Sequence, residues 1–280
     1  MKIKVDHFST GYSGKEVLHD LTFEVSNPGI YVVLGKNGAG KTTLFRSLTG
    51  MLKAYSGKIT YNDVDLEKSE VKIAYLGQRD AIPAGMSVEA ALKFFAKVEG
   101  VPDEAINNVS ERFGLKKFLG QNYQNLSEGQ RRRVSLAKSM LGEKEVMILD
   151  EPTSNLDPKI SSEIRDFIKQ ESKDRIILYS SHNLYEATDI GSEVIAISDG
   201  RILYVGDMNG LSAGHYRIGI RGIGIEKVTS DYTLDGKYYV FDLKSQDEAA
   251  DLVSLLASSG ARVYEVKDIS NVLERFYDEK

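Results

Sequence analysis

The 280-residue sequence predicts an α/β fold with a mainly parallel sheet, and two observations support this prediction. Short apolar runs, typical of strands buried on both faces, alternate along the chain with amphipathic stretches of helical period. The first of these strands is expected at residues 29–34, and it leads through a glycine-rich turn into a helix at residues 42–48. Such strand, turn and helix units in series place their strands parallel in one sheet.

A small antiparallel β region is expected before that first parallel strand. Residues 2–5 and 17–25 are rich in side chains that favour strands, and the turn-forming residues 10–14 lie between them. The chain is therefore expected to begin with two strands and to lead from them into the glycine-rich turn.

That turn, residues 35–42, which we call the phosphate loop, fits the pattern G-x-x-x-x-G-K-[ST] at every fixed position. Its glycines let backbone N–H groups turn inward around phosphate oxygens, and the start of the next helix adds partial positive charge. Lys41 is expected to reach the β- and γ-phosphates, and Thr42 to hold Mg²⁺. The sequence thus predicts a site for a nucleoside triphosphate.

A helical insert is expected at about residues 81–140, with helices at residues 88–98 and 105–113. Two further buried strands are expected at residues 145–149 and 175–179. Between them, Asp157 and Pro158 favour a helix start, because Asp is a good N-cap and Pro suits the first turn. The apolar stripe of that helix predicts core packing; its members are Ile160, Ile164, Phe167 and Ile168.

A separate, small α+β domain is expected at residues 211–280, after a glycine-marked boundary near residues 206–214. Strands are expected at residues 215–220, 237–243 and 262–266, and helices at residues 246–258 and 269–277. The preceding 210 residues form the main predicted domain.

Composition excludes several classes of protein. The net charge of −5 argues against a dedicated nucleic-acid binder, and the run Arg131-Arg132-Arg133 is expected to be a solvated helix face. The absence of cysteine excludes disulfides and thiolate metal sites. No segment approaches the roughly 18 uninterrupted apolar residues that a membrane span needs, so another chain would have to supply any spanning part.

Several motifs follow the phosphate loop in order, and together they resemble the nucleotide-binding subunit of ATP-binding cassette (ABC) transporters over about residues 1–210. The most specific is Leu-Ser-Glu-Gly-Gln at residues 126–130, the signature segment, which is similar to the family signature Leu-Ser-Gly-Gly-Gln. Glu128 is its one departure, at a place that varies in the family. The resemblance implies an ABC-type P-loop NTPase fold that binds ATP and Mg²⁺.

The resemblance also implies roles for individual residues. Glu151 would orient or deprotonate the attacking water, His182 would contact the γ-phosphate, Gln78 would sense Mg²⁺ and the γ-phosphate, and Asp150 would hold Mg²⁺. The residues expected to contact nucleotide are Tyr12 (adenine stacking), Gly35, Asn37, Gly38, Gly40, Lys41, Thr42, Thr43, Ser127, Gly129, Gln130 and Asp157. Thr42, Gln78 and Asp150 are the residues expected to hold the metal. The expected catalytic residues are Glu151, His182, Lys41 and Gln78.

In the mechanism that the resemblance implies, two copies trap ATP between the phosphate loop of one and the signature segment of the other. Such a homodimer would act on a separate transmembrane permease at the cytoplasmic face of the membrane, through residues 82–100, and no nucleic-acid partner is expected. The C-terminal stretch at residues 268–277 resembles the end of exporter-type ABC ATPases and favours export. Two alternatives are a soluble ABC-superfamily ATPase of repair or translation and a weakly hydrolysing regulatory module.

Overall fold

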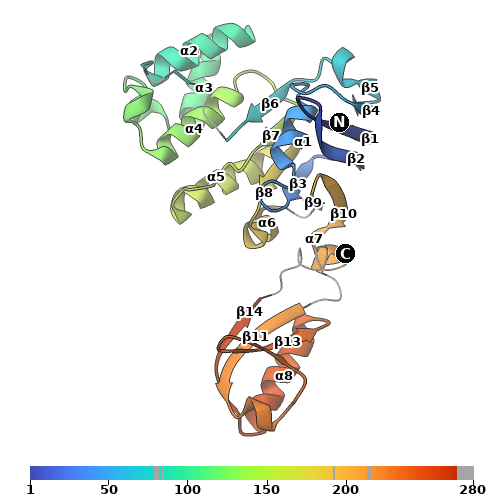
Figure 1. Cartoon of the computed structure of the whole chain (residues 1–280). Helices are drawn as coiled ribbons and strands as arrows, with labels where there is room; N and C mark the ends of the chain where they lie inside the picture. Colours follow the sequence, from blue (N-terminus) through green and yellow to red (C-terminus); the bar gives the residue numbers. More distant parts are fainter. Residues whose placement is uncertain (79–81, 84, 192, 213–215, 270–280) are drawn as a thin grey trace. The chain divides into compact units, whose positions relative to one another are not determined.

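The computed structural model describes residues 1–78, 82–83, 85–191, 193–212 and 216–269, and Figure 1 shows the order of their elements. The chain divides into two compact units, Met1–Val205 and Gly206–Lys280. Among the described residues, no helix is both long and apolar enough to span a lipid bilayer.

The centre of the first unit is a six-stranded sheet of order β10-β9-β3-β8-β7-β6. Its strands are β3 (Gly29–Leu34), β6 (Ile73–Leu76), β7 (Val146–Leu149), β8 (Ile176–Ser181), β9 (Glu193–Ser198) and β10 (Arg201–Asp207). β3 pairs in parallel with β8 and β9, and β7 pairs in parallel with β6 and β8. The predicted mainly parallel α/β fold is confirmed.

An antiparallel sheet of order β2-β1-β4-β5 accompanies it. Its strands are β1 (Ile3–Tyr12), β2 (Lys15–Val25), β4 (Ser56–Tyr61) and β5 (Val64–Asp65), and the short 3₁₀ turn Leu66–Lys68 follows. The turn predicted at residues 10–14 is wrong in extent: because Tyr12 pairs with Lys15, β1 continues to Tyr12 and only Ser13 and Gly14 make the turn.

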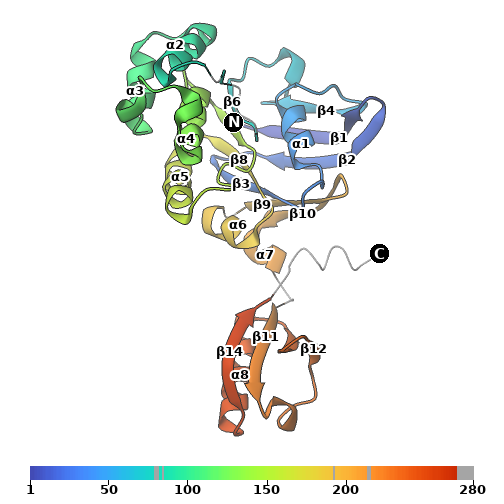
Figure 2. The same ribbon diagram turned by 60° about the vertical axis from the view of Figure 1, so that its left-hand side comes forward.

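Helix α1 (Lys41–Leu48) lies between these two sheets, as Figure 2 shows. Its buried side chains Leu44, Phe45 and Leu48 share one apolar cluster with residues of both sheets. Because α1 begins in the phosphate loop and packs in this cluster, the core of the unit fixes the loop's position.

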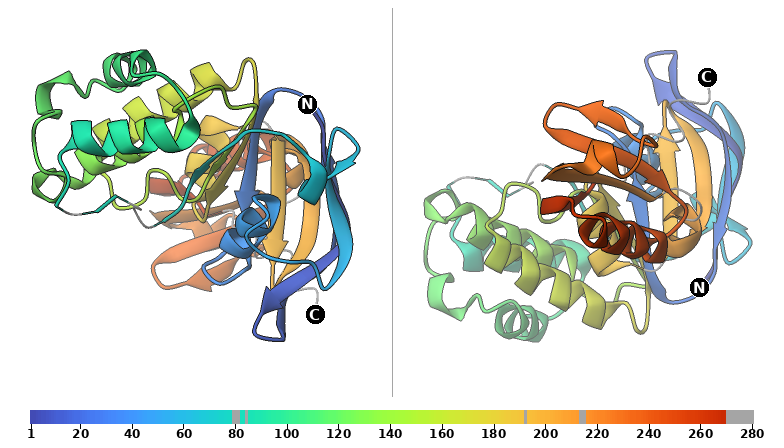
Figure 3. Two further views of the ribbon diagram at one scale, coloured as in Figure 1. Left: turned by 90° about the horizontal axis from the view of Figure 1, so that it is seen from above. Right: turned by 90° about the horizontal axis from the view of Figure 1, so that it is seen from below.

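The helical part of the first unit stands to one side of its strands in both views of Figure 3. It contains α2 (Val88–Glu99), α3 (Glu104–Arg112), the 3₁₀ turns Lys116–Phe118 and Tyr123–Asn125, and α4 (Glu128–Ser139). Two more helices, α5 (Pro158–Glu171) and α6 (Leu184–Ile190), follow β7 and β8. In α5 the predicted stripe is confirmed as core at Ile164 and Ile168, which are buried.

The second unit begins with the last two residues of β10, continues with α7 (Met208–Ser212) and has an antiparallel sheet of order β12-β13-β11-β14. Its strands are β11 (Tyr216–Ile223), β12 (Thr233–Asp235), β13 (Tyr238–Leu243) and β14 (Arg262–Asp268), with the 3₁₀ turn Ile225–Lys227. Helix α8 (Gln246–Ser258) packs on the sheet through Ala249 and Leu256. The last helix predicted from sequence, at residues 269–277, extends outside the described residues.

Candidate nucleotide site

The Lys41 side chain lies folded into the phosphate loop. It is only 5% exposed, and its ammonium donates hydrogen bonds to the carbonyl oxygens of Gly35 (2.7 Å) and Lys36 (3.1 Å). Burial lowers the pKa of Lys41, and the nearby carboxylates of Glu151 and Asp150 oppose that shift. A buried cation at the mouth of a helix N-terminus is suited to hold an anionic phosphate.

Two glycines of the loop are required by its geometry. Gly38 and Gly40 have φ angles of 86° and 109°, which L side chains adopt rarely. A Cβ atom on Gly40 would also lie 2.7 Å from Leu18 Cδ2, inside van der Waals contact. The loop can therefore keep this tight course only with glycine at these positions.

Asp150 lies at the end of β7 and is fully buried. Its carboxylate accepts hydrogen bonds from the hydroxyls of Thr42 and Ser180, each at 2.7 Å. The Gln78 amide nitrogen is 3.5 Å from the Thr42 hydroxyl, so Gln78, Thr42 and Asp150 lie together, as the sequence predicts.

These three side chains fit Mg²⁺ by their chemistry. Each offers an oxygen, and Mg²⁺ prefers one or two protein oxygens together with water and substrate phosphate. Among the described residues no group of three or more His, Cys, Asp or Glu side chains is arranged to hold a metal. The oxygens of Thr42, Gln78 and Asp150 suit an ion whose other ligands are water and a bound phosphate.

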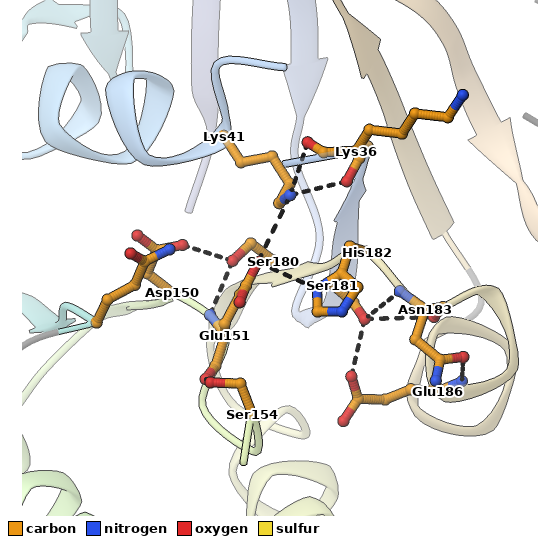
Figure 4. A network of polar contacts seen from close by, with 12 residues as sticks. Lys36, Lys41, Asp150, Glu151, Ser154, Ser180, Ser181, His182, Asn183 and Glu186 are labelled. Carbon is orange, nitrogen blue, oxygen red and sulfur yellow. Dashed lines mark hydrogen bonds and ion pairs between the residues drawn. The ribbon is translucent and has the colours of Figure 1, made fainter. Parts of the chain in front are cut away.

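Glu151 follows Asp150 with a φ of 46°, a left-handed conformation that is uncommon outside glycine. Its N–H donates to the Ser180 hydroxyl at 2.8 Å, which helps to hold this backbone. One carboxylate oxygen lies 3.6 Å from the Lys41 ammonium and 3.2 Å from His182 Nδ1. Figure 4 shows Lys41 and His182, from different elements, meeting at this carboxylate.

An open pocket of about 470 Å³ lies over the phosphate loop. Its lining residues are Val17, Asn37, Gly38, Gly40, Lys41, Thr42, Thr43, Gln78, Glu151, Ser154 and Asn155. Tyr12 is not among them; it is 38% exposed at the end of β1, where its hydroxyl accepts a hydrogen bond from Arg46 at 3.2 Å. Phosphate-binding and carboxylate groups thus meet in one pocket, and the expected adenine-stacking residue lies outside it.

The signature segment faces a different pocket. Ser127, Gly129, Gln130 and Asp157 line this second pocket, together with Asn155, which also lines the first. Ser127 caps α4 in a capping box with Gln130, and Asp157 caps α5 by accepting from the N–H of Ile160 at 3.0 Å. Within one chain Ser127, Gln130 and Asp157 act in helix caps, and the pocket that they line is not the one over the phosphate loop.

Sequence reasoning assigned no role to Ser180, which joins Asp150 to the Glu151 backbone. It also expected Arg132 to lie on a solvated helix face, and for this residue the expectation is wrong. The Arg132 guanidinium turns inward and donates to the carbonyl oxygens of Gly77, Asp150, Glu151 and Pro152. No local sequence pattern predicts the contacts of Ser180 or of Arg132, because their partners come from distant parts of the chain.

The family model described as "ABC transporter" matches residues 18–154. The ATP-binding protein EcfA2 of an energy-coupling factor transporter from Clostridium tetani is 30% identical over 74% of this chain and 79% of its own length. The uncharacterized ABC transporter ATP-binding protein YdbJ of Bacillus subtilis is 33% identical over 67% of this chain and 63% of its own length. This chain therefore spans less than two thirds of YdbJ.

A third relative extends through the second unit. The uncharacterized ABC transporter ATP-binding protein YhcH of Bacillus subtilis is 29% identical over 97% of this chain and 93% of its own length. Among solved structures, cbiO1 from Clostridium perfringens, part of an ABC transporter complex, is 26% identical with a TM-score of 0.66. That likeness covers 75% of this chain and 89% of cbiO1.

Proposed function

Because this chain belongs to the family of ABC transporter ATP-binding subunits, whose members are ATPases, we propose that it hydrolyses ATP to drive a membrane transporter. The observation that carries the proposal is the meeting of Lys41, Asp150, Glu151 and His182 beside the phosphate-loop pocket. A buried cation for phosphate and a carboxylate for water are two groups that promote hydrolysis of a phosphoanhydride such as that of ATP.

In the proposed reaction, backbone N–H groups of the phosphate loop and the Lys41 ammonium hold the β- and γ-phosphates. Glu151 accepts the proton of the attacking water, while His182, 3.2 Å from that carboxylate, contacts the γ-phosphate. Thr42, Asp150 and Gln78 would hold Mg²⁺, which when bound neutralises phosphate charge. Gly35, Asn37 and Thr43 complete the loop, and Tyr12 stacks on adenine.

We propose that the working form is a homodimer that encloses two ATP molecules. The arrangement within one chain supports this, because the signature segment lines a different pocket from the one over the phosphate loop and is available to a second copy. Ser127, Gly129 and Gln130 of a second copy would contact the γ-phosphate, and Asp157 would lie across the interface. Loss of the γ-phosphate removes the bridge and reopens the pair.

The partner of the dimer is, in this proposal, a separate transmembrane permease that contacts residues 82–100 at the cytoplasmic face of the membrane. ABC ATP-binding subunits work with such partners, which supports this assignment. Residues 1–210 would form the ATP-binding domain and residues 211–280 an accessory domain. The proposed direction is export, which rests on the sequence of the C-terminal stretch, and vesicle transport assays with the permease test it.

The first test compares wild type with Glu151→Gln in steady-state ATP hydrolysis, with oligomeric state followed by light scattering. A positioned general base contributes about 10²–10⁴-fold. Glu151→Gln should therefore lose turnover by about that factor, keep nucleotide binding, and accumulate an ATP-bound dimer. The exposed Glu104, in the first turn of α3, supplies the matched control Glu104→Gln, which should hydrolyse ATP at the wild-type rate. Wild-type turnover in Glu151→Gln would remove Glu151 from the mechanism.

A further inference from the structure

Arg132 bonds to main-chain groups that lie outside its own helix. It lies in α4, the helix that Ser127 caps, and its single guanidinium donates four hydrogen bonds to main-chain carbonyls. The acceptors are Pro152 O (2.8 Å), Gly77 O (3.1 Å), Asp150 O (3.0 Å) and Glu151 O (2.8 Å). One planar guanidinium thus connects α4 to two other segments of the first unit.

Those two segments carry the groups proposed for catalysis. Gly77 directly precedes Gln78, and the other three carbonyls belong to the turn that follows β7 and contains Glu151. The left-handed φ of 46° at Glu151 has to be held by its surroundings, and Arg132 contacts that residue's carbonyl and both neighbouring ones. Because the guanidinium is planar with five N–H donors, it fixes the relative position of all four carbonyls.

We propose that Arg132 is a positioning residue that links the two nucleotide sites of the dimer, an inference that rests on the proposed function. In that dimer, the Ser127 end of α4 contacts the ATP on the second copy. Glu151 and Gln78 of the same chain serve the ATP on their own phosphate loop. A displacement of α4 on closure is passed through Arg132 to Glu151, so engagement of one site aligns the carboxylate of the other.

The test uses three full-length variants. Arg132→Gln removes the charge and most donors, whereas Arg132→Lys keeps the charge as a point donor that cannot reach several carbonyls. Lys138→Gln is the matched control: it removes a positive charge from the same helix, where the ammonium lies 4.8 Å from the centre of the Phe95 ring. For each, the kcat, the Hill coefficient for ATP and the Kd of a fluorescent ATP analogue without Mg²⁺ are measured.

In Arg132→Gln, kcat should fall about 10- to 100-fold, as expected when a reacting group is misplaced by roughly 1 Å. Its Hill coefficient should move toward 1, while the analogue Kd stays close to wild type, because the phosphate loop is untouched. Arg132→Lys should resemble Arg132→Gln, and Lys138→Gln should resemble wild type. A fall in kcat with an unchanged Kd distinguishes a positioning role from a general loss of structure.

Wild-type kcat and cooperativity in Arg132→Gln would overturn the proposal, and so would a parallel loss of kcat and nucleotide affinity. A second measurement does not depend on turnover: amide hydrogen exchange should rise at the ends of β6 and β7 in Arg132→Gln and stay unchanged in β3. Unchanged exchange at β6 and β7 also overturns it. If wild type hydrolyses no ATP, the proposed function fails, and the exchange experiment still decides whether Arg132 holds these segments.

Discussion

The phosphate loop and the signature segment both lie in the first unit, yet they use their polar side chains in opposite ways. Around the phosphate loop, Lys41 and Asp150 are buried and contact groups from several distant elements. In the signature segment, the side chains of Ser127 and Gln130 each bond to the other residue's N–H at the start of α4. The first half of the site is rigidly assembled by the fold, and the second is a pair of capped helix ends that faces outward.

This difference suggests that the two halves serve different steps of the reaction cycle. Burying the charges of Lys41 and Asp150 is tolerable because each has partners, and a bound phosphate would replace the loop carbonyls that Lys41 now contacts. A capped helix N-terminus has no such local requirement for a ligand. Substitutions in the two halves should therefore affect different steps: nucleotide binding by one chain in the first, and association of two chains in the second.

Among the substitutions that compare the two halves, the largest effect is expected for Lys41→Met. Losing a charged donor to phosphate should weaken ATP-analogue binding by a single chain about 10- to 100-fold. Fluorescence titration at protein concentrations below dimerisation measures this, with exposed Lys58→Met on β4 as the control. Equal affinity in Lys41→Met and wild type would mean that the loop binds phosphate by its backbone alone.

Ser127→Asp should affect the opposite half. Aspartate is a good N-cap, so α4 keeps its cap, but the added negative charge would face the γ-phosphate on a second copy. We expect ATP-dependent dimerisation of Glu151→Gln to weaken about 10-fold when this change is added, with unchanged monomer binding.

Ser245→Asp provides the matched control, because Ser245 caps α8 of the second unit in the same way. Each change is combined with Glu151→Gln, and light scattering with and without Mg-ATP measures the dimerisation of both double variants. Undiminished dimerisation in Ser127→Asp would place the signature segment outside the dimer interface.

A smaller effect is expected for Ser180→Ala, which tests how rigidly the first half is assembled. This change takes a donor from the buried Asp150 carboxylate and an acceptor from the Glu151 N–H. The free energy of unfolding should fall by about 1–3 kcal/mol. Ser198→Ala is the control: Ser198 ends β9, two strands from β8 in the same sheet, and its hydroxyl contacts Asp199 at 3.4 Å, so this change should cost less in the same urea titrations. Equal costs would show that Ser180 has no special role in holding the turn.

The sequence predicts the locally encoded elements well. Helix α8 coincides with its predicted range, and the predicted caps of α5 are present, because amphipathic period and capping residues act within a few positions. β4 was not predicted, although Ile59, Thr60 and Tyr61 at its end favour strands. Its pairing with β1, more than 40 residues earlier, depends on tertiary structure and is not visible in the local sequence.

The candidate site divides in the same way. The phosphate loop, Asp150, Glu151 and His182 stand in motifs, and the structure brings them together. Ser180 and Arg132 carry no motif of their own, because each acts through carbonyls, N–H groups or a carboxylate from remote segments. Their roles in the site depend on tertiary contacts, and the prediction of a solvated Arg132 is wrong for that reason.

The smallest predicted effect is the pH dependence that Lys41, in the phosphate loop, gives to the free energy of unfolding. Burial lowers the pKa of Lys41 in the folded chain below its ordinary value of 10.5, so near that value the unfolded chain binds more protons. Stability attributable to this group therefore rises with pH across the window between the two pKa values. Urea titrations between about pH 8 and 10.5 should give wild type a more positive slope of unfolding free energy against pH than Lys41→Met. Lys58→Met should keep the wild-type slope, and identical slopes in all three would mean that the folded loop leaves the Lys41 charge as stable as it is in the unfolded chain.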